Sequence, residues 1–298
     1  MENADAIDTL LATDALARVA APLRALVRPA IKIVQGIEWT ETATGDSRLG
    51  GTPDLPPDTS WQTDETGAPL AFIAQICLAD VAGIIADSPL PRTGWLQFYF
   101  EQEAFFRHYF ARHDASAESR SNAVIFVDAN ANLVSAAPPD ALSESNRYPQ
   151  SPLAFEPVAM LPSLETCYLG EQLYPRSECI VLNGDEWLFY ADAISDSDSD
   201  FYLLPNVSHL LGYAQQGQPR CMEASYEHYR AKLFPDLPPW DMLTPGEKQR
   251  EHEENTLLLQ VEPFTQNAQF GRGGALYYFA RRGDIGSGDF SKAWAWVQ

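Results

Sequence analysis

The sequence predicts an α+β fold built on curved antiparallel sheets, with a pseudo-twofold internal repeat and with flanking helices and long Pro/Gly-rich loops. Three observations predict this class. The 298 residues include 22 prolines and 18 glycines, which favours many turns over a helical bundle. From about residue 49 onward, short runs of β-branched and aromatic residues alternate with Gly/Pro turns, as strands do. Two of these runs share one pattern, which indicates a repeat.

The first element is an amphipathic helix between Asp14 and Val27. Apolar residues recur there at spacings of three and four, the period of one helix face. Asp14 is suited to the N-cap, and Pro29 ends the helix. We therefore expect residues 1–48 to form a helical extension that packs on a body made of residues 49–298.

The body contains six strong strand predictions, in which β-branched and aromatic residues cluster between turn residues. They cover residues 69–81, 94–100, 122–128, 186–191, 256–264 and 275–282. Helices are predicted over residues 101–113 and 224–234. A third helix begins at Thr244, where Glu247 can close a capping box, and runs to about residue 255.

A glutamine marks the same place in two similar units. Gln75 and Gln260 each follow an apolar strand and precede a loop and a Gly-x-Leu-x-aromatic-aromatic run. The equivalent positions are Gly94 and Gly274, Leu96 and Leu276, Phe98 and Tyr278, and Tyr99 and Phe279. The pattern predicts two equivalent hairpins, one in each half; chance similarity of two aromatic-rich strands is the alternative.

The glycines around Arg272 predict a turn. In a phosphate-binding loop, glycines follow a strand and open a helix, whereas here they precede a strand.

Charge limits the classes of partner. Asp and Glu number 41 against 20 Lys and Arg, so the formal net charge is −21. Such a chain is repelled by phosphate backbones and anionic membranes, which argues against nucleic acid and membrane binding and favours basic proteins. The N-terminus has no secretory-signal pattern, no run of about 18 apolar residues occurs, and the four cysteines lack zinc-like spacing. We expect a cytoplasmic protein with reduced thiols.

No catalytic residue, metal site or cofactor is predicted. Asp196, Asp198 and Asp200 match the first, third and fifth positions of an EF-hand loop, but Phe201 and Val207 stand where glycine and glutamate are needed. A solvated acidic loop is favoured there over a looser calcium site. We expect Cys77, in an apolar strand, to be a buried and inert thiol.

Five segments in order resemble the YwqG-like family of bacterial proteins, a domain of unknown function. They are "GGTPDLPPDTSW", "PLAFIAQICL", "LPRTGWLQFYF", "HLLGYAQ" and the C-terminal stretch from "NTLLLQVEPF" to "SKAWAWVQ". The resemblance runs from about Leu49 to Gln298. It implies one α/β body on curved antiparallel sheets and supplies no catalytic residues. The chain departs from the family at Cys77 and at Gly271–Arg272, where relatives often carry an aspartate.

Some relatives look like immunity proteins, which neutralise toxins delivered between bacteria. The resemblance and the charge together favour an immunity (antitoxin-type) protein that binds a basic toxin, for example a nuclease. We expect its acidic surface to include exposed carboxylates at Asp196, Asp198, Asp200, Glu251, Glu253 and Glu254.

The alternative is a small-molecule or metal-binding protein, or an enzyme, with a site assembled between the two pseudo-repeats. The candidate residues for such a cleft are Gln75, Gln260, His209 and Arg272.

Overall fold

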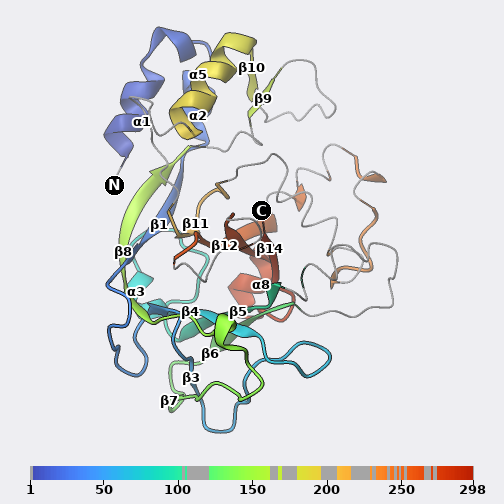
Figure 1. The fold of residues 1–298 in the computed structure, drawn as a ribbon. Coiled ribbons are helices and arrows are strands. Elements are labelled where there is room, and N and C mark those ends of the chain that lie inside the picture. Colours follow the sequence, from blue (N-terminus) through green and yellow to red (C-terminus); the bar gives the residue numbers. More distant parts are fainter. Residues whose placement is uncertain are drawn as a thin grey trace.

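A ten-stranded antiparallel sheet dominates the protein. Its strand order is β14-β13-β12-β11-β1-β8-β2-β4-β5-β6, and the sheet curves until it is nearly closed (Figure 1). The computed structural model describes residues 3–102, 105, 121–161, 167–169, 180–195, 207–215, 229, 233–239, 242–244, 247, 250–251, 254–264, 270 and 274–297. The strands of the sheet are β1 (Arg28–Gln35), β2 (Arg48–Leu49), β4 (Ala71–Cys77), β5 (Trp95–Phe100), β6 (Asn122–Val127), β8 (Ser151–Met160), β11 (His209–Leu211), β12 (Asn255–Val261), β13 (Leu276–Arg281) and β14 (Trp294–Val297).

Two short strand pairs and several helices complete the fold. β3 (Asp54–Leu55) pairs with β7 (Val134–Ser135), and β9 (Cys167–Leu169) pairs with β10 (Ile180–Leu182). The helical elements are α1 (Ala4–Leu11), η1 (Asp14–Leu16), α2 (Ala20–Ala25), α3 (Leu78–Val81), η2 (Glu144–Asn146), α5 (Gly184–Ser195) and α8 (Arg282–Ser287). In the part of the chain that is described, no helix combines the length and apolarity needed to cross a membrane.

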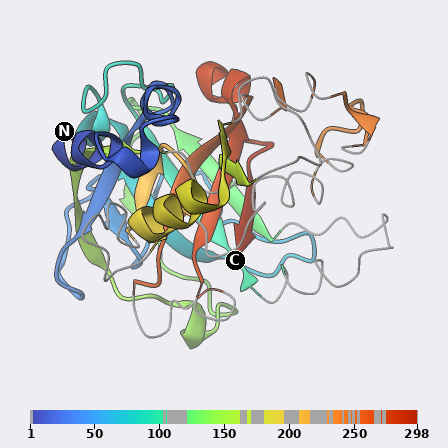
Figure 2. The same ribbon diagram turned by 90° about the horizontal axis from the view of Figure 1, so that it is seen from above.

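The core has one large cluster inside the curved sheet and two smaller ones outside it. The large cluster joins both halves, for example through the edge-to-face contact of Phe98 and Tyr278, whose ring centroids lie 5.0 Å apart. A second cluster lies beneath α1, α2 and α5, which gather on one side of the molecule (Figure 2). The third, around Phe72 and Tyr99, covers the outer face of β4 and β5.

Two hairpins share one register. In β4–β5, Gln75 faces Gln97, and the pairing is irregular between Phe72 and Ala74. In β12–β13, Gln260 faces Tyr277, and the pairing is irregular between Leu257 and Leu259. The irregularity therefore falls at the same distance before each glutamine.

The strand predicted over 186–191 is wrong, because this segment lies in the helix α5. Glu186, Tyr190, Ala193 and Ile194 are buried at helical spacing. A capping box starts the helix: the Asn183 N–H donates to Glu186 Oε2 at 2.8 Å, and the Glu186 N–H donates to Asn183 Oδ1 at 2.9 Å.

The N-terminal extension is not helical throughout. Residues 28–35 form β1, which lies between β11 and β8 inside the sheet. A residue before proline is restricted to extended conformations, so Arg28 before Pro29 starts a strand. The single helix predicted over 14–27 is two short helical elements, η1 and α2.

The other strand predictions are confirmed at β4, β5, β6, β12 and β13. The predicted capping box is also present: the Thr244 N–H donates to Glu247 Oε2 at 2.8 Å, and the Glu247 N–H donates to Thr244 Oγ1 at 3.4 Å. Of the segment predicted as a glycine turn, residues 271–273 lie outside the described residues; the Gly274 N–H, just before β13, donates to the Phe270 carbonyl at 2.9 Å. The helices predicted over 101–113 and 224–234 lie largely outside the described residues.

Candidate functional site

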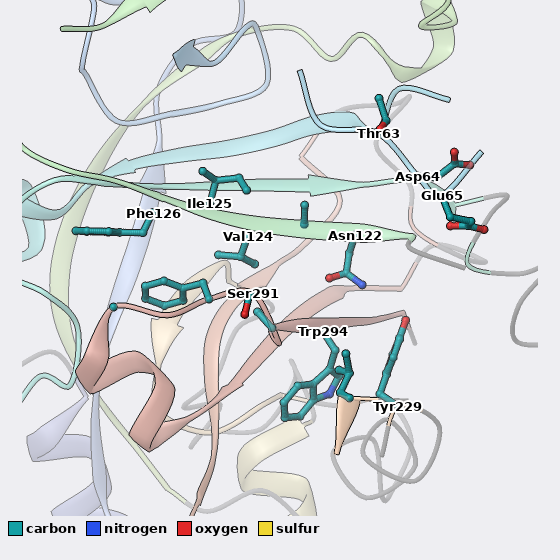
Figure 3. Close-up of a pocket in the computed structure, with 15 residues that line it drawn as sticks. Thr63, Asp64, Glu65, Asn122, Val124, Ile125, Phe126, Tyr229, Ser291 and Trp294 are labelled. Carbon is teal, nitrogen blue, oxygen red and sulfur yellow. The ribbon is translucent and has the colours of Figure 1, made fainter. Parts of the chain in front are cut away.

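A pocket of about 770 Å³ lies at the seam where the two edges of the sheet approach each other (Figure 3). β6 forms one edge and β14 the other, and the two strands come close without pairing. The walls of this seam pocket are residues 63–65, residues 122–126 of β6, Tyr229, Leu233, and a C-terminal segment comprising Gly288, Phe290, Ser291, Ala293 and Trp294. The two halves of the chain therefore both contribute to it.

Packed aromatic side chains give the pocket its apolar walls. Phe126 and Phe290 lie with ring centroids 6.2 Å apart. Trp294 stacks on Phe279 at 5.8 Å and contacts Phe234 edge-to-face at 5.9 Å. Trp294 is fully buried between these rings, so the packing of the core holds this wall of the pocket in one position.

One polar atom in the pocket has no partner. Asn122 is only 7% exposed, and its Oδ1 accepts no hydrogen bond. In Figure 3 this oxygen lies at the wall of the pocket, where it is buried from solvent, while the amide nitrogen points toward the hydroxyl of Tyr229. The Ser121 and Asn122 side chains hydrogen-bond Tyr229, and burial raises the pKa of Tyr229 to about 12. Tyr229 therefore keeps its proton at neutral pH.

One end of the pocket is acidic. Asp64 and Glu65 lie near the Asn122 end of β6 (Figure 3). Asp64 is buried and shapes its loop, because its Oδ1 accepts from the backbone N–H groups of Thr66 at 2.8 Å and Ala68 at 2.9 Å. Glu65 is exposed. None of the described residues that line the pocket is Lys, Arg or His, so the described lining carries only negative formal charge, at Asp64 and Glu65.

Gln75 and Gln260, predicted as cleft residues, are fully buried and hold loops in place; neither lines the seam pocket. Gln75 Oε1 accepts from the Asp54 N–H at 2.9 Å and from Gln97 Nε2 at 3.0 Å. Gln260 Oε1 accepts from the Gln215 N–H at 2.7 Å.

His209 is buried beside Gln260, its partner across β11 and β12. Its Nδ1 lies 3.0 Å from the Val207 carbonyl oxygen and its Nε2 lies 3.0 Å from that of Tyr213. Burial lowers the pKa of the imidazole, and the two carbonyls partly oppose that shift. His209 does not line the seam pocket either.

The acidic residues predicted to be exposed are described only in part. Asp196, Asp198, Asp200 and Glu253 lie outside the described residues, as does the cleft candidate Arg272. Glu251 pairs with Arg281 at 2.8 Å and its side chain is 12% exposed; Glu254 is half-buried. The exposure predicted for Glu251 is therefore wrong, because its ion pair with Arg281 on β13 holds the side chain against the rest of the protein.

A second hollow of about 380 Å³ lies beside Asp46, Ser47 and Asp80. The Ser47 hydroxyl donates to Asp80 Oδ2 at 2.7 Å and accepts from the Cys77 N–H at 2.8 Å. Cys77 is half-buried rather than buried, and burial raises the pKa of its thiol. The described residues that line this hollow include no histidine, so Ser47 lacks the imidazole that usually activates a catalytic serine.

The described residues contain no cluster of three or more His, Cys, Asp or Glu side chains that could hold a metal ion.

Sequence reasoning missed the seam pocket. Its walls come from segments far apart in the chain. The strand predicted over 122–128 and the helix predicted over 224–234 both contribute lining residues, but neither pattern marked them as a site.

The family model for a domain of unknown function, DUF1963, matches residues 47–298. The match covers most of the chain, so the protein belongs to this family. No curated protein matches the chain.

Proposed function

We propose that this protein acts by binding a partner and that the seam pocket is its binding site. The observation that carries the proposal is the unpartnered Oδ1 of Asn122 in a largely apolar pocket. An unpaired buried acceptor costs about 1–3 kcal/mol, so a ligand that donates to it would recover that cost. In the described part of the lining there is no Cys, His, Lys or Arg, which supports binding over acyl transfer.

The partner in this proposal is a basic protein, and the role is that of a cytoplasmic immunity protein that neutralises a toxin, for example a nuclease. The net charge of −21 supports it, because opposite charges speed the association of two proteins at low salt. The acidic end of the pocket adds a local complement to a basic partner.

The internal repeat that we propose accounts for the position of the pocket, because it makes β6 and β14 equivalent edge strands. Two turns, at residues 48–54 and 209–215, make matching contacts. The backbone N–H of Asp54 and that of Gln215 each donate to the glutamine of their hairpin. The carbonyl of Asp54 accepts from Gln97 Nε2 at 2.6 Å, and that of Gln215 accepts from the Tyr277 hydroxyl at 2.6 Å.

The backbones of the two turns also agree. Gly50 and Gly51 have φ angles of 60° and 72°, and Leu211 and Gly212 have φ angles of 62° and 74°. In the repeat we propose, the strands β2-β4-β5-β6 correspond to β11-β12-β13-β14. β6 and β14 are then equivalent edge strands, and the pocket lies between the two repeats.

A small molecule is the second candidate ligand. A volume of about 770 Å³ falls within the range of small-molecule sites, roughly 300–1,000 Å³. This reading needs no protein partner.

Affinity purification of the tagged protein from its native lysate, at low and raised salt, separates the two candidates. We expect one stoichiometric basic protein whose recovery falls as salt rises. The purified protein is also examined by native mass spectrometry. Recovery of the protein alone, with a small molecule bound, would refute the protein-partner proposal and support the second candidate.

A further inference from the structure

The outer backbone edge of β6 is unpaired along the seam pocket in the described part of the chain. Among the described strands, β6 pairs with β5 alone, with Phe100 opposite Asn122 and Leu96 opposite Phe126. The Glu101 N–H donates to the Ser121 carbonyl at 2.8 Å. This bond shows which residues of β6 turn their N–H and C=O groups toward β5. In an antiparallel pair, every second residue turns its N–H and C=O away from the partner strand. For β6, these are Asn122, Val124 and Phe126.

These backbone groups face the pocket. Residues 122–126 all line it, although neighbouring side chains of a strand lie on opposite faces. Five consecutive lining residues therefore mean that the strand presents its edge to the pocket. Within the described part of the chain, no hydrogen bond reaches the outward N–H and C=O groups of Val124 and Phe126. A row of unpaired donors and acceptors of this kind is a template for another strand.

We propose that an extended, basic segment of the protein partner adds to the sheet at β6, and that β14, which lies close to β6 across the seam, moves aside to admit it. This inference rests on the proposed function, since it takes the partner to be a protein. Five strand residues span about 15 Å, which suits a partner segment of about five residues. Its main chain bonds Asn122, Val124 and Phe126, and its alternate apolar side chains pack against the half-buried lining residues Phe126 and Leu233.

Charge selects a basic segment. The acidic groups Asp64 and Glu65 lie at the Asn122 end of β6, and among the lining residues that the structure describes none is positively charged. A Lys or Arg at the matching end of the segment meets Glu65, and a side-chain donor reaches Asn122 Oδ1. Regular backbone donors and acceptors distinguish this surface from a site for a small apolar molecule, which needs few of them.

Selection from a displayed library of random octapeptides against the purified full-length protein tests the inference. We expect enriched peptides to alternate apolar residues with other residues and to carry Lys or Arg toward one end. In the NMR spectrum, such a peptide should slow the amide exchange of Val124 and Phe126 at least about tenfold. Ala123 and Ile125, whose N–H groups already face β5, are the internal control.

Two matched variants separate backbone pairing from charge. N-methylation of one peptide amide that faces β6 should weaken binding about tenfold, while N-methylation of the next amide should do so less. Glu65→Gln should weaken binding about two- to fivefold, and Glu144→Gln, an exposed acid on η2, should leave it unchanged. The library yielding no peptides, or peptides without basic residues or without amide protection at β6, would overturn the inference. A toxin recovered from the lysate that binds without protecting β6 would overturn this inference alone, whereas recovery of no protein partner refutes the proposed function.

Discussion

Arg48 and Asp54 form a buried ion pair, with Arg48 Nη2 2.5 Å from Asp54 Oδ2 and side chains that are 3% and 2% exposed. The same carboxylate accepts from the Gly45 N–H at 2.7 Å and from Gln75 Nε2 at 3.0 Å. This pair therefore joins the turn after β2 to the first hairpin. In the repeat we propose, His209 and Gln215 take the corresponding places, so both charges are replaced together.

Asp54→Asn should lower the free energy of unfolding by about 3–5 kcal/mol, because it leaves the buried Arg48 guanidinium without its counter-charge. Urea denaturation followed by tryptophan fluorescence measures the change. Asp8→Asn breaks the exposed pair with Arg24 and should cost less than about 1 kcal/mol. Equal costs for the two variants would contradict this account of the Arg48–Asp54 pair.

Replacing either loop-holding glutamine should destabilise the fold. Gln75→Met and Gln260→Met keep much of the side-chain volume but leave the N–H of Asp54 or Gln215 unpaired, at a cost of about 1–3 kcal/mol. Urea titration of both variants gives the two costs. Gln62→Met, in which only an exposed hydrogen bond of 3.2 Å is lost, should stay within about 0.5 kcal/mol of the parent. Free energies that match this control would show that the glutamines do not hold the loops.

The sequence predicts the fold class because the hairpin strands are continuous apolar runs that end at turn residues. β4 is one example, with six successive buried residues. Secondary structure was predicted wrongly where the local composition favours one element and the tertiary context another. The aromatic run at 186–191 reads as a strand, yet the Asn183–Glu186 capping box starts a helix there. β1 was not predicted because the short β-branched segment directly follows a stretch with helical periodicity. This segment is buried only by its pairing with β8 and β11.

The site was harder to predict than the fold. Gln75 and Gln260 stand out in the sequence because they are repeated, but a polar residue in a buried strand also recurs when it satisfies the backbone of a loop. The seam pocket depends on how the sheet curves until β6 and β14 approach. That relationship leaves no local pattern at Asn122 or Trp294.

Stability should fall as the pH drops below about 6.5, in part through His209. Burial lowers its native pKa, so the native imidazole stays neutral while the unfolded one gains a proton. The unfolded state then binds more protons, and the free energy of unfolding decreases with falling pH by up to about 1.4 kcal/mol per pH unit. Urea denaturation of the parent and of His209→Gln between pH 7.5 and 5 should show a difference that shrinks toward acid. A difference that is constant with pH would mean that His209 titrates alike in both states.

Cys77 should react slowly with iodoacetamide at pH 8. Burial is the main cause that raises the pKa of the thiol, and the Asp80 carboxylate also raises it, so little thiolate is present. Alkylation followed by peptide mapping reports the rate at Cys77 separately from the other cysteines. Asp80→Asn should speed the reaction, whereas Asp87→Asn, an exposed acid, should not. Reaction of Cys77 as fast as glutathione would contradict the prediction.

Asn122→Leu should separate stability from binding. The substitution removes the unpartnered Oδ1 together with the amide that hydrogen-bonds Tyr229, and leaves a side chain of similar size. The two effects oppose each other, so the free energy of unfolding should stay within about 1 kcal/mol of the parent. Binding of the selected peptides should weaken about tenfold or more, because their donor loses its acceptor. Asn255→Leu is the matched control: Asn255 is 6% exposed and its Oδ1 is also unpartnered, but it lies outside the pocket. It should change stability by a similarly small amount and leave peptide affinity unchanged. Parent-like affinity in Asn122→Leu would remove Asn122 from the binding site, and an equal loss in both variants would trace the effect to the fold.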